Sequence, residues 1–172
     1  MAEINAIETH YKGYRFRSKL EARWTIFLDV MGIKWQYEYE GFVLHGDVPY
    51  LPDFYFPQFE IWGEVKPYTL RPLEREKCKR LCECTQQEVL LLDDMPDFRP
   101  YTLFYWVPLG QQKDLTDTPL ISSGEVDTCE IVITDDLRSC DPYLWGFDRR
   151  AKESLYGKTY SDAVNSARSA RF

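Results

Sequence analysis

Histidine is nearly absent from the chain, which holds only His10 and His45 among its 172 residues. This scarcity argues against His-rich metal sites, although it excludes no single catalytic histidine. The five cysteines include no C-x-x-C pair, so a structural zinc site at Cys78, Cys82 and Cys84 is less favoured than plain reduced thiols. Their odd number, without an export signal, predicts a reducing cytosol rather than a disulfide framework.

Long apolar runs are also missing: no stretch approaches the ~18 residues that cross a bilayer, so we expect no membrane partner. The N-terminus lacks the basic-then-apolar order of a secretory signal, and we therefore expect a cytoplasmic protein. Apolar residues make up 44% of the chain and aromatic residues 16%, which is ample for a buried core. The length fits a single domain.

The net charge of −7 argues at first against a nucleic-acid partner. Residues 85–148, however, hold 13 acids and 3 bases, so the remainder carries +3. A basic face on the remainder can dock on phosphates. The acidic region 85–148 can mimic DNA or dock a basic protein.

Hydrophobic periodicity predicts helices and short strands in an order typical of an α/β sandwich around a mixed sheet. We expect helices at 19–31, 73–84 and 161–171, and strands at 34–40, 89–92, 101–107 and 130–134, with two more strands inside 50–66. Ser18 and Gly32 suit the two ends of the first helix.

The expected organisation is one domain with a core over about 14–107, an acidic loop or insertion over about 108–148, and a C-terminal helix over about 160–172. Residues 108–128 show turn residues and acids with little periodicity, which is typical of an insertion or mobile loop.

Acidic residues gather in the segment 50–66. Alternation places Glu60, Trp62, Glu64 and Lys66 on one face of their strand, and a hairpin with the preceding strand would bring Asp53 beside Glu64. Two close carboxylates repel each other, so the pair needs a proton or a cation. Oxygen ligands of this kind suit Mg²⁺, which can acidify a water and offset charge on a phosphate.

Lys66 would lie about 7 Å along the strand from Glu64, where it could hold or help deprotonate that water. The alternative is structural: Pro52-Asp53 would be ordinary turn chemistry, and Glu64 and Lys66 an exposed ion pair on a strand edge.

Glu21 has two interpretations. Ser18-x-x-Glu21 fits a capping box, in which the glutamate accepts from the N-cap backbone N–H. Glu21 also borders the apolar stripe of Leu20, Trp24 and Leu28, which would turn it towards the sheet edge and the predicted metal site.

Together, the segments 14–24, 50–54 and 64–67 resemble the PD-(D/E)XK superfamily of restriction-like nucleases. The similarity covers about residues 14–92 and follows the order helix Glu, Pro-Asp, Glu-x-Lys, helix, strand. The terminal segment 166–172 is similar to the closing helix of small members that are often borne by phages or mobile elements.

This resemblance implies an αβββαβ restriction-endonuclease-like core and hydrolysis of DNA that leaves a 5′-phosphate. It implies Asp53, Glu64 and the Val65 carbonyl as Mg²⁺ ligands, with Mn²⁺ able to substitute. Lys66 would lie beside the attacking water, with Glu21 as an accessory acid. The expected location is the cytoplasm of a bacterial or phage-infected cell.

Basic residues lie before or on both helices of the core. They could bind DNA, or they could form a solvated helix face paired with Glu74 and Glu76. Among them Arg17 and Arg71 flank the acidic site, and we expect these two to bind the DNA backbone. Cutting both strands would require two sites, as in a homodimer.

The competing hypothesis is a catalytically silent nuclease-fold module that binds DNA or a protein partner, the latter through the acidic region 85–148. A weaker third option is a nuclease that acts on RNA.

Overall fold

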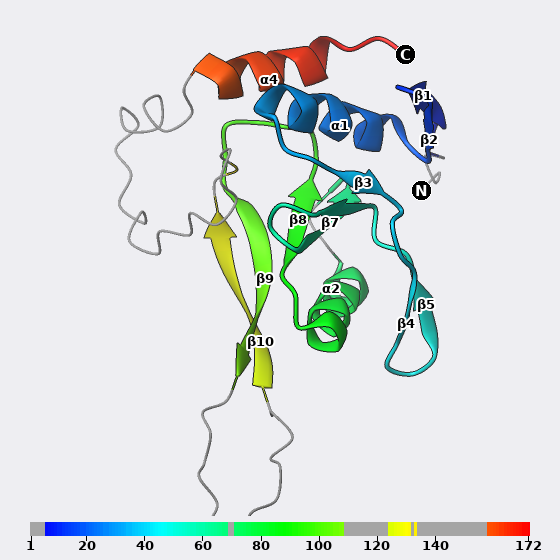
Figure 1. The fold of residues 1–172 in the computed structure, drawn as a ribbon, viewed down its shortest axis with the longest axis vertical. Helices are drawn as coiled ribbons and strands as arrows, with labels where there is room; N and C mark the ends of the chain where they lie inside the picture. Colours follow the sequence, from blue (N-terminus) through cyan, green and yellow to red (C-terminus); the bar gives the residue numbers. More distant parts are fainter. Residues whose placement is uncertain (1–5, 69–70, 109–123, 132, 134–157) are drawn as a thin grey trace, which may run out of the picture.

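A computed structural model describes residues 6–68, 71–108, 124–131, 133 and 158–172. These residues form a mixed α/β fold with a six-stranded mixed sheet and three helices (Figure 1). The α/β class expected from the sequence is therefore confirmed. None of the described helices is both long and apolar enough to cross a membrane.

Short strands dominate the first half of the chain and longer ones the second. The strands are β1 Thr9–Tyr11, β2 Tyr14–Phe16, β3 Gln36–Tyr37, β4 Phe42–Leu44, β5 Val48–Tyr50, β6 Phe54–Phe56, β7 Ile61–Lys66, β8 Val89–Asp93, β9 Tyr101–Pro108 and β10 Gly124–Ile131. The helices are α1 Lys19–Met31, α2 Pro72–Thr85 and α4 Lys158–Ser169.

The main sheet has the strand order β10-β9-β8-β7-β6-β3. Its neighbours pair antiparallel except β7 and β8, which are parallel. Parallel neighbours need a crossover, and α2 supplies it. The hairpins β1–β2 and β4–β5 form two separate two-stranded sheets.

Helix α1 has the predicted bounds and both predicted ends. Ser18 is the N-cap, and its hydroxyl accepts a hydrogen bond from the Glu21 N–H at 3.2 Å. Gly32 ends the helix at φ 74°, a left-handed conformation that suits glycine.

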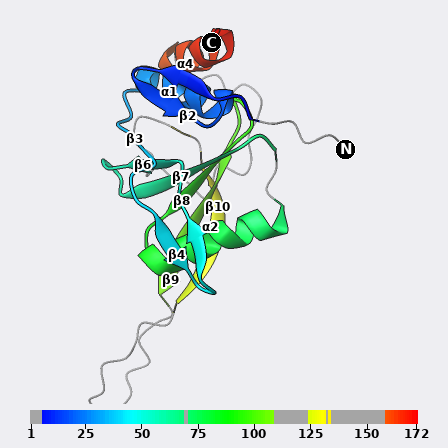
Figure 2. The ribbon, with the colours of Figure 1, turned by 90° about the vertical axis from the view of Figure 1, so that its right-hand side faces the viewer.

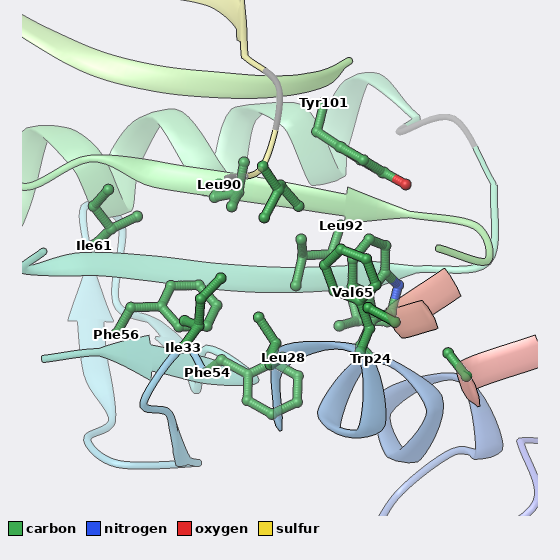
Figure 3. Packing of buried hydrophobic residues seen from close by; sticks show 14 of the residues in the cluster. Trp24, Leu28, Ile33, Phe54, Phe56, Ile61, Val65, Leu90, Leu92 and Tyr101 are labelled. Atoms are coloured by element: carbon green, nitrogen blue, oxygen red, sulfur yellow. The ribbon is translucent and has the colours of Figure 1, made fainter. Parts of the chain in front are cut away.

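The sheet is covered on both faces. Alternate side chains of its central strands therefore enter two different hydrophobic clusters, one on each face. On one side α1 and α4 pack on the sheet; on the other lie α2 and the β4–β5 hairpin (Figures 1 and 2). The first cluster includes Trp24, Leu28, Phe54, Val65, Leu90, Leu92 and Tyr101 (Figure 3). The second includes Leu44, Trp62, Cys78, Leu81, Leu91 and Phe104. Because β7 lies between β6 and β8 with helices on both faces, its side chains are buried up to Val65.

Several predicted bounds need correction. The strand expected over 34–40 is reduced to β3, since Glu38 has a left-handed φ of 47° that ends the extended run. Residues 124–128, predicted as loop, form the first part of β10. They pair with β9, which is a contact that their own sequence pattern does not show. Residues 109–123, 132 and 134–157 lie outside the described residues, as does most of the predicted acidic insertion.

Hairpins β1–β2 and β4–β5 were missed. Their turns use left-handed residues, Lys12 and Gly13 in the first and Gly46 and Asp47 in the second.

Candidate active site

Strands β6 and β7 bring Asp53 and Glu64 together, as the hairpin prediction required. Phe54 pairs with Gly63, and one further step along the two strands sets Asp53 opposite Glu64. The Asp53 Oδ2 atom accepts a hydrogen bond from the Val65 N–H at 2.7 Å. The two residues are only 3% and 5% exposed, so two carboxyl groups share a buried position.

Close packing at Gly63 brings these strands against each other. A Cβ atom at position 63 would lie 2.8 Å from the Cε2 atom of Phe56, which is closer than carbon atoms pack. Glycine therefore allows Phe54 and Phe56 of β6 to pack over β7, on the face of the sheet opposite to the Glu64 side chain.

Glu64 and Lys66 are same-face neighbours, as predicted. The Lys66 Nζ atom lies 2.5 Å from the Glu64 Oε1 atom. The alternative of an exposed ion pair on a strand edge is wrong, because β7 is an inner strand and the Glu64 side chain is buried. The Glu64 Oε2 atom is also buried and has no hydrogen-bond partner among the described residues.

Negative charge dominates the electrostatics of this position. Burial and then the Glu64 carboxylate and Glu21 raise the pKa of Asp53 to about 8, against the opposing effects of Lys66 and the Val65 N–H. Burial lowers the pKa of Lys66, but Glu64 and Asp53 outweigh it and the pKa is raised. Burial and then Glu64 likewise raise the pKa of Cys78 to about 12.

Arg17 lies at the site, although its partner is a carboxylate of the protein. Its Nη2 atom donates to the Asp53 Oδ1 atom, and its Nε atom lies 2.9 Å from the Glu38 Oε1 atom. The side chain is still 52% exposed. The role of Arg17 in binding DNA stays a prediction.

Glu21 makes capping contacts and also lies at the site, while its part in a metal site stays a prediction. Its carboxylate accepts from the Ser18 hydroxyl at 2.6 Å, the Tyr37 hydroxyl at 2.6 Å and the Arg17 N–H at 3.0 Å. The capping box is thus changed in detail, since the Glu21 carboxylate accepts from the N–H of Arg17, one residue before the N-cap. Glu21 also lines the same groove as Asp53 and Glu64.

That groove has a volume of about 760 Å³. Its charged lining residues are three bases and three acids: Arg17, Lys66, Lys77, Glu21, Asp53 and Glu64. Val65 lines it as well, while its carbonyl as a metal ligand stays a prediction. The apolar part of the lining comes mainly from the β4–β5 hairpin and the residues beside it.

Arg71 is not among the residues that line this groove. It is the N-cap of α2, and its guanidinium lies 5.2 Å from the centre of the Tyr68 ring. Sequence reasoning chose Arg71 and not Lys77 among the bases of this helix, and it missed the Tyr37 hydroxyl at the site. The one available signal was helical spacing: Lys77 precedes buried Leu81 by four residues, so the two lie on one side of α2.

The donor set fits a hard divalent cation in part. The described residues contain no group of three His, Cys, Asp or Glu side chains arranged to hold a metal ion. Mg²⁺ commonly takes only one or two protein carboxylates and keeps several waters, and Asp53 and Glu64 provide two. The unpartnered Glu64 Oε2 atom is a ligand not used within the described structure. Two carboxylates, one of which has an oxygen without a hydrogen-bond partner among the described residues, therefore fit such an ion.

The cysteines in the described part of the chain form no metal-binding group. Cys78 and Cys82 are buried free thiols on α2, Cys84 is exposed and Cys129 lies on β10. Burial raises the pKa of Cys82 to about 12, which opposes a thiolate ligand or nucleophile. Cys140 lies outside the described residues.

Comparison with protein-family models gives no match, and comparison with curated proteins gives no match either. The interpretation of the site therefore depends on its own residues and geometry.

Proposed function

We propose that the chain is a metal-dependent endonuclease that hydrolyses DNA phosphodiester bonds. The observation that carries the proposal is the buried pair of carboxylates, Asp53 and Glu64, with the Lys66 ammonium beside Glu64 and a Glu64 oxygen left without a partner. Burying two acids opposite each other is costly, and such costly arrangements cluster at functional sites.

Each residue has a proposed role. Asp53 and Glu64 would hold Mg²⁺ or Mn²⁺. When bound, the cation would offset the charge of the phosphate and lower the pKa of a bound water. Lys66 would donate a hydrogen bond to the attacking water and hold it in line with phosphorus. Glu21, already held by Ser18 and Tyr37, would be the accessory acid.

The order of elements supports the restriction-endonuclease-like core that the resemblance implies. A helix with Glu21 precedes a strand entered from Asp53, a strand with Glu64 and Lys66 follows, and a helix then leads to a parallel strand. Hydrolysis would add one water across the P–O bond and leave a 5′-phosphate and a 3′-hydroxyl.

A catalytically silent module that binds DNA or protein is the second candidate. Arg17 favours it, because its guanidinium already compensates the charge of Asp53 without any metal. The two functions differ in one result, which is turnover in the presence of a divalent cation.

The test is nicking of supercoiled plasmid with Mg²⁺ or Mn²⁺. We expect activity that is lost on addition of EDTA and falls at least about 100-fold in Glu64→Ala and in Lys66→Ala, because each removes a group at the reacting centre. Appearance of linear product with nicked plasmid would indicate cutting of both strands.

Glu8→Gln is the matched control, because Glu8 is an exposed acid that pairs with Arg15. It should keep the activity of the unchanged chain. Nicking that survives both Glu64→Ala and Lys66→Ala would contradict the proposal, and DNA binding without nicking under either metal would favour the silent module.

A further inference from the structure

The β4–β5 hairpin forms an apolar wall beside the carboxylates. Its two faces differ: Leu44 and Tyr50 pack towards Trp62 and α2, whereas Val43 and Pro49 point outwards. Val43 and Pro49 are cross-strand partners, both exposed, and both line the groove. Val43 is 68% exposed, which is high for an apolar residue next to a charged site.

The other wall carries Lys77, on α2. Arg17 and Lys66 both pair with acids of the groove, but Lys77 has no ion pair or hydrogen bond among the described residues. Two other bases of α2 are engaged: Arg75 lies over the Phe104 ring, and Arg80 pairs with Glu76. Lys79, the remaining base, does not line the groove. Lys77 is therefore the base of the groove whose charge stays available.

The charge of the groove indicates what this lysine would bind. Three bases face three acids, so the groove is close to neutral, and a divalent cation on the acids would make it positive. An anion is then the matching ligand. The lysine on one wall matches the phosphate of a nucleic-acid strand, and the apolar pair on the other wall matches its sugar or base.

We propose that Lys77 binds a backbone phosphate of DNA while Val43 and Pro49 contact the sugar or base of the same strand. The hairpin and α2 thereby hold one strand across Asp53 and Glu64. This inference rests on the function proposed above, because it takes DNA as the ligand, and it names the two walls that receive the strand.

The experiment measures binding of a fluorescent DNA duplex by anisotropy, with Ca²⁺ as an oxygen-bound divalent cation in place of Mg²⁺ and in EDTA as comparison, over salt from about 50 to about 200 mM, with Lys77→Ala and with the matched control Lys79→Ala. Lys79 lies on the same helix outside the groove. We expect Lys77→Ala to bind DNA about fivefold more weakly. Its plot of log K against log salt should be less steep by about 0.9, because one phosphate contact is lost. Lys79→Ala should change binding less than about twofold.

A second variant tests the apolar wall. Val43→Ser changes an exposed side chain, so the fold should be kept, and a thermal melt checks this for each variant. We expect a KM for plasmid nicking about threefold higher with an unchanged kcat, since the contact holds the strand and not the reacting atoms.

Failure of this inference and failure of the proposed function give different results. If the chain nicks DNA but Lys77→Ala behaves like Lys79→Ala, the phosphate contact is overturned and the nuclease proposal stands. If the chain binds DNA without nicking and Lys77→Ala alone loses affinity and salt slope, the groove assignment stands and the nuclease proposal fails. Absence of any DNA binding by the unchanged chain would overturn the inference.

Discussion

Arg17 and Lys66 compensate two buried carboxylates in different ways. Lys66 is adjacent to Glu64 on the same strand and approaches it from within the groove. Arg17 comes from the segment before α1 and binds Asp53, the residue that the nuclease proposal needs as a metal ligand. A guanidinium and a divalent cation would then compete for one carboxylate.

Replacement of Arg17 by alanine tests this competition. We expect Arg17→Ala to bind Mn²⁺ about fivefold more tightly in the absence of DNA, because the cation no longer competes with the guanidinium for Asp53. The gain is only about 1 kcal/mol, since solvent weakens this half-exposed ion pair. Isothermal titration calorimetry measures the affinity directly.

Arg15→Ala is the control for Arg17→Ala, since Arg15 pairs with Glu8 on the surface. It should leave Mn²⁺ affinity unchanged. Weaker Mn²⁺ binding by Arg17→Ala would mean that the guanidinium orients Asp53 and does not compete with the metal.

At the scale of elements, strand β7 performs two tasks. Its side chains alternate between the two packing layers, with Ile61 and Val65 on one face and Trp62 on the other. Glu64 follows the same alternation and so faces α2 and the hairpin. Gly63 precedes Glu64 on β7 and permits the close contact with β6 that sets Asp53 opposite Glu64.

Gly63→Ala should therefore lower the free energy of unfolding by about 1–3 kcal/mol. The added Cβ would lie 2.8 Å from Phe56 Cε2 and 3.1 Å from Phe54 Cβ, so the Phe56 ring or the two strands must shift. Urea unfolding followed by tryptophan fluorescence measures the change.

Gly41→Ala provides the comparison, because the nearest atom to its added Cβ is 3.9 Å away. It should change the free energy of unfolding by less than about 0.5 kcal/mol. Equal losses in the two variants would show that the packing of β6 on β7 does not depend on the glycine.

At the scale of the whole molecule, the C-terminal helix supports the element that carries Glu21. Helix α4 packs beside α1 through buried Ala163, Val164 and Ala167 (Figures 1 and 2). Tyr160 of α4 also donates to the Asp97 carbonyl at 2.8 Å, which ties the helix to the segment before β9. The two ends of the described chain thus share one layer.

Ala167→Glu should lower the free energy of unfolding by about 3 kcal/mol or more, because it places an unpaired carboxylate in this layer. Thermal and urea unfolding measure the loss. Asn165→Glu, at an exposed position of the same helix, should change stability by less than about 0.5 kcal/mol. Similar stability of the two variants would contradict the packing of α4 against the rest of the fold.

Local patterns were sufficient for much of this structure. The stripe from Leu20 to Met31, with Ser18 before it and Gly32 after it, predicted α1 with its bounds. Alternation in 50–66 predicted that Glu64 and Lys66 share a face and that Asp53 approaches Glu64. These features depend on residues close in sequence, whose backbone geometry follows the helical or strand period.

The tertiary structure decided the rest, because the remaining contacts join distant parts of the chain. Arg17 meets Asp53 across 36 residues, and no periodicity relates the two. The burial that makes Glu64 unlike a surface acid comes from the neighbouring strands and α2. Val43 and Lys77 share a groove only because the hairpin and α2 pack on the same face of the sheet. The sequence by itself thus determined which side chains the central hairpin presents, and long-range packing determined what surrounds them.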